Sequence, residues 1–308
     1  PCLLLVGYMI FLIPSCRYVK PKPGGSVILQ TIVAGFSAFA SCPPSLARQS
    51  ERNGGRFSDT FVANVGAMGH VVALMLYVLP FSVIYGQMGG LFVIQANSLE
   101  VAGPINSGFL NNFDAIGVLI AGVVIGNGIY PFLDKRGIKL SMMTKFGIGS
   151  FLSCVAVLFG IMIDHMMKSQ YAKNGEKISI FWMAIPFLLI GFGEVFVYST
   201  SYELAFTLSP EGFKAFGSAL NLFVIGCINN LIVTALLKAC NSMIVYPPNP
   251  KMELKEMKYY AETRLDEYYW ILFGIGAIGV IAPAIPWSRQ YYNYCWNRAE
   301  KLKQGIVF

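Results

Sequence analysis

The chain has 308 residues, of which 55% are hydrophobic and 13% are charged, and its mean hydropathy is +0.57. Soluble globular proteins carry about 25% charged residues, so this composition cannot cover a water-facing surface. It excludes a soluble enzyme, a disordered regulator and a nucleic-acid-binding domain, although the formal net charge is +7. The sequence therefore predicts an all-α protein that crosses a membrane several times.

Runs without Asp, Glu, Lys or Arg predict where the chain crosses the bilayer, because a spanning helix needs about 20 mainly apolar residues. None of these runs alternates between polar and apolar residues as a barrel strand does, so all are predicted as helices. There are seven: 1–16, Met68–Ile94 within 60–99, Ala115–Leu133, Phe146–Ile163, a run from Ile178 that continues past Glu194, Ala215–Leu237 and Tyr268–Ser288.

A long segment separates the first run from the other six. Residues 17–60 are expected to be a cytoplasmic linker, whose Val27–Ala40 core is apolar but only 14 residues long, as in a lateral helix. Residues 61–288 are expected to form a six-helix half and residues 289–308 a cytoplasmic tail. Because Pro1 begins inside an apolar run, we expect a fragment or a processed product, with 1–16 a truncated last helix of a preceding half.

The distribution of Lys and Arg predicts the orientation in the membrane. Of the 23 basic residues, 15 lie in the alternate loops 17–59, 134–145, 211–214 and 289–308. The positive-inside rule places these loops in the cytoplasm and the segment 238–267 outside. The net charge then reflects topology and attraction to anionic lipid, so the bilayer is the expected partner and nucleic acid is not.

Glu194 is the most informative polar residue, because it lies well inside a hydrophobic run. An ionisable group at that depth usually faces a cavity and has a partner. The functional interpretation is a site for a substrate amine or a proton, and the alternative is a structural ion pair with a Lys or Arg of another helix. No basic residue lies centrally in any of the seven runs, so we expect the partner to be a ligand or a group outside this chain.

Three further polar residues are candidates for a site. Glu203 lies near the cytoplasmic end of the same helix, where an interfacial acid or a salt bridge is favoured over a gating role. Asp114 opens the third run, where an N-cap and a cavity role are equally supported. Gln87 lies among Gly86, Gly89 and Gly90 and could bond a neighbouring helix or a substrate, while the glycines allow that helix to bend.

The chain shows no pattern typical of enzymatic, metal or disulfide chemistry. Its seven cysteines are scattered, and only His70 and His165 could supply imidazole. Nucleophile, zinc-protease and phosphate-loop motifs are all absent from the sequence. We therefore expect no enzyme activity, no metal site and no cofactor.

The segment 185–195, which contains Gly191, Gly193 and Glu194, continues through 200–203 to Ser209–Pro210 and Lys214. It resembles the tenth helix of the proton-coupled oligopeptide transporters of the major facilitator superfamily. Other segments resemble further parts of that family in the same order: 21–27 the segment after the sixth helix, 85–96 the seventh helix and 130–131 the end of the eighth.

This resemblance implies a major facilitator-like six-helix C-terminal bundle, preceded by one helix and a cytoplasmic linker. It also implies proton-coupled import of di- and tripeptides by alternating access, with the proton gradient as driving force and the plasma membrane as the expected location. Glu194 would bind the peptide amino terminus and serve as a proton-coupling candidate, with Glu203 as a gating candidate. The other substrate-binding positions carried over by resemblance are Gln87, Phe92, Asp114 and Asn221.

The sequence also departs from the family pattern. Phe92 and Asn221 stand where the family has tryptophans, and Gly86 stands where many members have an acid. The first-helix E-x-x-E-R motif has no counterpart, so the N-terminal half is expected to be a missing partner. Two alternatives remain: transport of another small solute such as nitrate, or a membrane sensor or scaffold that has lost transport.

Overall fold

The structure is a computed structural model, and it describes residues 2–13, 17, 27–40, 45–101, 103, 105–244 and 257–305. Within them, six helical stretches are long and apolar enough to cross a membrane. The stretches are built from α3 (Asp59–Met75), η4 (Leu76–Val78) and α4 (Leu79–Tyr85); α6 (Asn111–Val123), η5 (Val124–Ile129) and α7 (Tyr130–Lys135); α8 (Met142–Asn174); η6 (Ile180–Met183) and α9 (Ala184–Leu208); α10 (Lys214–Phe223), η7 (Val224–Ile228) and α11 (Asn229–Ala239); and α14 (Leu265–Ala284).

These six stretches match the last six predicted runs, but several boundaries differ. The first of them starts at Asp59 instead of Met68, because the Ser58 hydroxyl caps this helix by accepting from the Phe61 N–H. The α8 helix continues to Asn174 instead of ending at Ile163. A charge-free run ends at the first ionised residue by definition. A helix can continue beyond that residue where its charged side chains form ion pairs.

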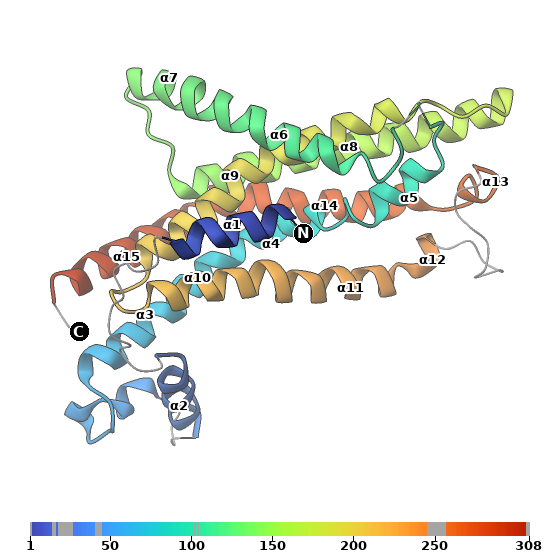
Figure 1. Cartoon of the computed structure of the whole chain (residues 1–308). Helices are drawn as coiled ribbons and strands as arrows, with labels where there is room; N and C mark the ends of the chain where they lie inside the picture. Colours follow the sequence, from blue (N-terminus) through green and yellow to red (C-terminus); the bar gives the residue numbers. More distant parts are fainter. Residues whose placement is uncertain are drawn as a thin grey trace.

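Three long helices form the centre of the bundle. α8 packs along its length against both α9 and α14, and these helices run side by side in Figure 1. Close packing is possible because small residues let the backbones approach. A Cβ added to Gly149 of α8 would lie 2.8 Å from the Gly193 carbonyl oxygen of α9.

Two helical stretches lie at the periphery. In the most apolar part of Asn111–Lys135 and of Lys214–Ala239 only 17% of residues are buried, against 56% in Met142–Asn174. Figure 1 shows them as the upper and lower edges of the bundle. Each contains a π-helical turn, at Val124–Ile129 and Val224–Ile228. Such turns often occur at functional positions.

The helix that carries Gln87 is broken at the glycines that were expected to let it bend. α4 ends at Tyr85, a turn covers 86–90, and the short helix α5 (Leu91–Asn97) follows. The Gln87 carbonyl accepts from the N–H groups of both Gly90 and Phe92, which closes this turn. The bend is therefore a fixed part of the fold.

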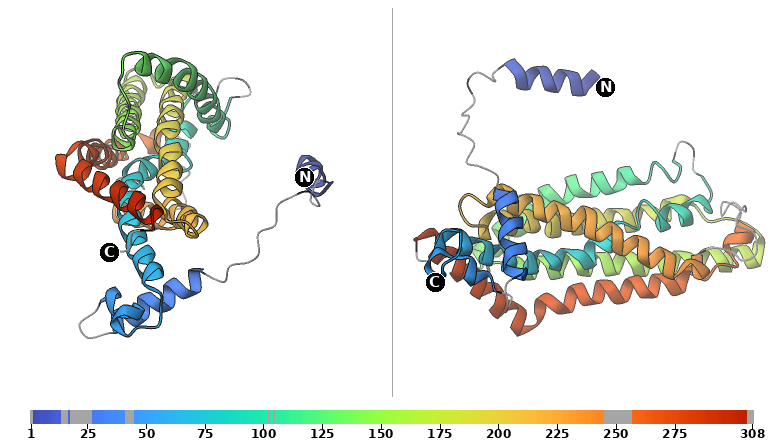
Figure 2. Two further views of the ribbon diagram at one scale, coloured as in Figure 1. Left: turned by 90° about the vertical axis from the view of Figure 1, so that its left-hand side faces the viewer. Right: turned by 90° about the horizontal axis from the view of Figure 1, so that it is seen from below.

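The remaining helices lie at the bundle's ends or outside it. α2 (Val27–Ala40) has the predicted bounds, and α1 (Cys2–Leu12) stands apart from the bundle in Figure 2. α15 (Pro286–Lys303) starts three residues before the predicted tail. Pro286 keeps Ile285 in an extended conformation, with ψ at 134°, so α14 cannot continue into α15. The run predicted to reach Ser288 therefore ends at Ala284.

Candidate substrate site

Glu194 is positioned by the two glycines that precede it on α9. A Cβ on Gly191 would lie 2.5 Å from the Asp114 carbonyl oxygen of α6, and one on Gly193 would lie 2.7 Å from the Phe81 ring of α4. Neither position has room for a side chain. α9 therefore packs closely against α6 on one side and against α4 and α8 on the other. These contacts fix the position of Glu194 along and around the helix axis.

The side chains around Glu194 come from α4, α6 and α9. The Tyr85 hydroxyl and the Asp114 carboxyl both lie close enough to the Glu194 side chain to interact with it electrostatically. Tyr85 and Tyr198 pack edge to face, with ring centroids 5.3 Å apart, and Phe81 joins both rings. Two acids thus lie together beside an aromatic cluster.

This pair of acids has no cationic partner in the described part of the chain. Glu194 and Asp114 are absent from the ion pairs found there. Asp114 is 9% exposed, and its Oδ1 has no hydrogen-bond partner among the described residues. The nature of the partner of Glu194 stays a prediction.

Asp114 does not cap its helix, so the capping interpretation was wrong. The N-cap of α6 is Leu110, which has no side-chain bond, and Asp114 lies in the first turn beyond it. Its position against Gly191 turns it towards α9. The cavity role of Asp114 stays a prediction.

Gln87 and Asn221 are buried and only partly satisfied. Gln87 donates through Nε2 to the Val83 carbonyl oxygen at 3.3 Å, while its Oε1 has no partner in the described residues. Asn221 of α10 accepts a hydrogen bond from Ser201 of α9 through Oδ1, and its amide nitrogen has no partner there. Each amide thus keeps one polar atom for a further contact.

Phe92 and Glu203 lie in different surroundings. Phe92 is completely buried between Phe187 and Tyr269, at ring-centroid distances of 5.9 and 5.8 Å, so packing alone accounts for it. Glu203 is half exposed and pairs with Lys145 of α8 at 3.2 Å, in agreement with the favoured salt-bridge interpretation. Neither is grouped with Glu194 by these contacts, and their functional roles stay predictions.

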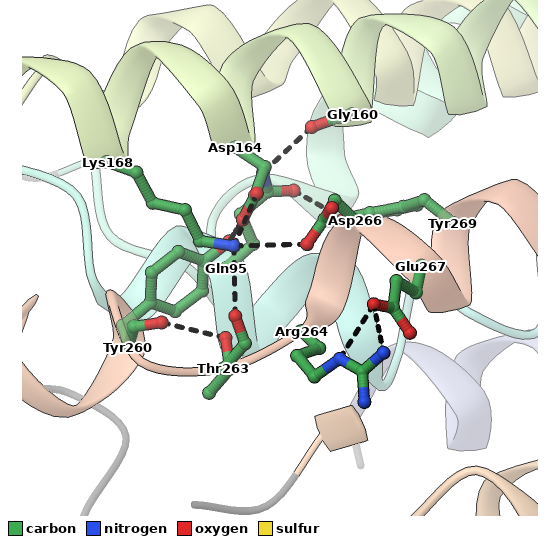
Figure 3. Close-up of polar contacts among 10 residues, drawn as sticks. All are labelled: Gln95, Gly160, Asp164, Lys168, Tyr260, Thr263, Arg264, Asp266, Glu267 and Tyr269. Carbon is green, nitrogen blue, oxygen red and sulfur yellow. Dashed lines mark hydrogen bonds and ion pairs between the residues drawn. The ribbon is translucent and has the colours of Figure 1, made fainter. Parts of the chain in front are cut away.

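Figure 3 shows a second polar cluster that was not expected from the sequence. It is centred on Asp164, which is completely buried in α8. Lys168, one turn later, contacts Asp164 at 2.8 Å and Asp266 of α14 at 3.3 Å. The Tyr260 hydroxyl of α13 (Met257–Tyr260) donates to Asp164 at 2.7 Å. Burial and then the Asp164 charge raise the pKa of Tyr260 well above its ordinary value, so it remains a donor.

Gln95 extends this cluster to α5. Its amide nitrogen donates to the Gly160 carbonyl oxygen of α8 at 3.0 Å, and its oxygen accepts from the Tyr269 hydroxyl of α14. The short helix after the break is thus fixed to the two central helices. The signal that could have revealed the cluster is the i, i+4 spacing of Asp164 and Lys168, which places both on one helix face.

Comparisons with known proteins agree with this helical arrangement. The chain is 24% identical to the peptide transporter PTR_B of Candidozyma auris over 99% of the chain and 51% of that protein. It is 26% identical to the protein NRT1/PTR family 8.2 of Arabidopsis thaliana, over 76% of the chain and 42% of that protein. The chain thus spans about half the length of these relatives, or less.

Two solved structures share the fold. An auto-inhibited POT family peptide transporter aligns with 87% of the chain and 53% of its own, with a TM-score of 0.59 and 20% identity. The POT family transporter PepTSo aligns with 94% of the chain and 64% of its own, with a TM-score of 0.57 and 19% identity.

These similarities confirm the predicted fold class, a multi-pass all-α membrane protein with a major facilitator-like six-helix bundle. The match to a protein-family model covers far more of the chain than any single motif does. The model described as the POT family matches residues 1–247, about four fifths of the sequence, so the chain belongs to the POT family.

Proposed function

We propose that this chain forms the C-terminal part of a proton-coupled symporter of di- and tripeptides that works by alternating access. In this proposal Glu194 binds the cationic amino group of the peptide, and Asp114 and Tyr85 shape its surroundings. Gln87 and Asn221 supply the polar atoms that contact the peptide backbone. The missing N-terminal half of the transporter supplies the opposite wall.

The observation that carries this proposal is the pair of acids without a cation. Two carboxyl groups that share a membrane-embedded site need a proton or a cationic group to offset their charge. A peptide amino group and a proton are the two cations that this transport cycle would supply. The same charge disfavours an anionic substrate such as nitrate at this site.

The exposed helix faces support a cavity shared with a second half. Leu119 and Val123 of α6 are 72% and 62% exposed, and Leu231 of α11 is 66% exposed. Nothing in the described chain would lie within 4 Å of a Cβ at Gly122 or Gly126, so this face of the helix is left open there. Apolar faces with small residues are typical of helix–helix interfaces in membranes.

The proposal is tested by dipeptide uptake into proteoliposomes that contain the complete transporter and carry an imposed proton gradient. The change Glu194→Gln removes the charge and keeps the shape, and we expect the apparent peptide affinity to fall roughly thirtyfold or more. Glu211→Gln is the matched control, because this exposed acid lies in the loop after α9, and uptake should stay near the wild-type value.

An N-acetylated dipeptide sharpens the test, because it lacks the cationic amino group. We expect the wild-type protein to transport it poorly and Glu194→Gln to reduce that uptake little further. Equal loss for both substrates would contradict the assigned contact with the amino group. Absence of gradient-driven uptake by the wild-type protein would favour the sensor alternative.

A further inference from the structure

An apolar recess of about 270 Å³ lies between α8 and α14. Gly147 and Phe151 of α8 form one side of it, and Pro283 and Ala284 of α14 form the other. The two helices come together here, since a Cβ on Gly147 would lie 3.7 Å from the Val280 carbonyl oxygen. This α8–α14 groove therefore lies along the seam of a closely packed helix pair.

The surface around the groove is apolar and exposed. Phe151 within it is 56% exposed, and the nearby Ile278 and Ile281 of α14 are both 60% exposed. The helices α6 and α11, whose exposed faces we assign to contact with a second half, pack against α9 and α4 and do not line the groove. Large exposed apolar surfaces mark sites of contact with a membrane or a partner. The groove is therefore available to the hydrocarbon of the bilayer.

One end of the groove carries a single positive charge. Arg289 of α15 is the only charged residue in its lining. This side chain is exposed and forms no ion pair within the described chain. Lys145 follows the lining residue Thr144 but is already paired with Glu203 at 3.2 Å. Arg289 is therefore the cation that remains available at this end.

Neighbouring residues indicate that this end of the groove lies at the membrane surface. Arg289 is the first charged residue after the charge-free run Tyr268–Ser288. Trp287 is 66% exposed and stacks on Tyr291, with ring centroids 5.6 Å apart. Tryptophan beside a basic residue is typical of the headgroup level. The positive-inside rule places this level in the cytoplasmic leaflet, which carries anionic lipids.

The helix that carries Arg289 is fixed to the bundle. Ser288 accepts a hydrogen bond from the Tyr77 hydroxyl of α3 at 2.7 Å. Further along α15, the Nη1 of Arg298 lies 3.3 Å from His70 Nε2 of α3. The backbone of Arg289 is thus held at the end of the groove, while its side chain stays unpaired within the described residues.

We propose that the α8–α14 groove binds an anionic phospholipid of the cytoplasmic leaflet, with one acyl chain in the groove and the phosphate paired with Arg289. A guanidinium group suits phosphate because it presents a fork of donors to the oxygen atoms. The first turn of α8, which includes Thr144, adds the positive end of its helix dipole at the same end of the groove. This site is separate from the proposed peptide site, and its test does not depend on transport.

The test is native mass spectrometry on the full protein purified in detergent, titrated with dioleoyl phosphatidylglycerol or with zwitterionic dioleoyl phosphatidylcholine. We expect the wild-type protein to bind phosphatidylglycerol about fivefold more tightly, as one basic residue at the membrane surface would cause. Arg289→Gln should remove this preference. Lys303→Gln is the matched control and should keep it, because Lys303 is exposed on the same helix and does not line the groove.

A second pair of variants tests the position of the acyl chain. Ala284→Phe fills the groove without a change in charge, so it should weaken the binding of both lipids by at least about fivefold. Ile281→Phe is its control, because Ile281 is exposed on the same helix outside the lining, and binding should stay near the wild-type value. This pair keeps the test decisive if Arg289→Gln folds poorly.

Four results would overturn the proposal. Equal wild-type affinity for the two lipids would show that the charge selects nothing. A preference that survives Arg289→Gln, or that Lys303→Gln abolishes as well, would show that the phosphate binds elsewhere or diffusely. Unchanged binding in Ala284→Phe would exclude the acyl chain from the groove. Competition by glycerophosphoglycerol, the headgroup without its chains, would show that the site takes a soluble anion.

Discussion

At the scale of single residues, the segment Gly191–Phe192–Gly193–Glu194 combines packing and chemistry. The glycines bring α9 against its neighbours, and the acid that follows is placed beside Tyr85 and Asp114. The Glu194 carboxyl group and the glycines that make the close helix contacts are thus only one to three residues apart. Any shift of the α9 backbone here also moves the carboxyl group.

Gly191→Ala tests this coupling. The new methyl group would lie 2.5 Å from the backbone oxygen of Asp114, which cannot rotate away, so one helix must move. We expect a loss of about 1–3 kcal/mol in stability. The measurement is thermal unfolding in detergent. Gly274→Ala in α14 is the control, because nothing in the described chain lies within 4 Å of its Cβ, and it should unfold at or above the wild-type temperature.

At the scale of helices, the short α5 is held by side chains and not by chain continuity. The turn at 86–90 separates it from α4, and Gln95 fixes it to α8 and α14 (Figure 3). The neighbouring ion pairs of Lys168 join α8 to α14. The polar cluster therefore makes one unit of three helices at this end of the bundle.

Lys168→Met tests the strength of this unit. It leaves the Asp164 carboxylate, which is completely buried, without its cation. Breaking a buried pair in this way costs about 3–5 kcal/mol, and the 22% exposure of Lys168 favours the lower end. We expect the melting temperature to fall by roughly 6 °C or more. Lys173→Met, an exposed lysine of the same helix, should change it little; equal shifts would contradict the role of the pair.

At the scale of the whole molecule, the segments predicted on opposite sides of the membrane lie at opposite ends of the bundle. The segments predicted as cytoplasmic gather at the end where α2, α3, α7 and α15 lie, on the left of Figure 1, and α12 (Asn241–Ile244) and α13 lie at the other end. The loops that the order of the predicted spans assigns to one side of the membrane therefore also lie together in the structure. Their side of the membrane stays a prediction of the positive-inside rule.

Cysteine labelling tests the orientation. In a cysteine-free background, Lys303→Cys at the end of α15 should react with a membrane-impermeant maleimide only after the cells are permeabilised. Lys173→Cys near the end of α8 should react in intact cells, because the two positions are predicted on opposite sides. The reverse pattern would show that the chain is inserted the other way round.

The sequence predicted the helices and their order because length and apolarity decide whether a segment can span a bilayer. The glycines indicated that the helix with Gln87 could bend, but the predicted run Met68–Ile94 continued through the point where the structure breaks it. It failed at Asp164 and Lys168 because an ion pair cancels the charges that mark the end of a span. Residues 18–26, which carry one of the family-like motifs, lie outside the described residues.

By itself, the sequence determined a six-helix membrane half of the POT family and singled out Glu194, because hydrophobicity and local motifs are properties of neighbouring residues. Only the tertiary structure decided that Asp114 joins Glu194 instead of capping a helix, that Phe92 packs in the core, and that His70 meets Arg298. The physical reason is that each of these contacts joins residues distant in the chain. They depend on how helix faces are rotated and aligned, which glycine contacts and buried polar bonds set in three dimensions.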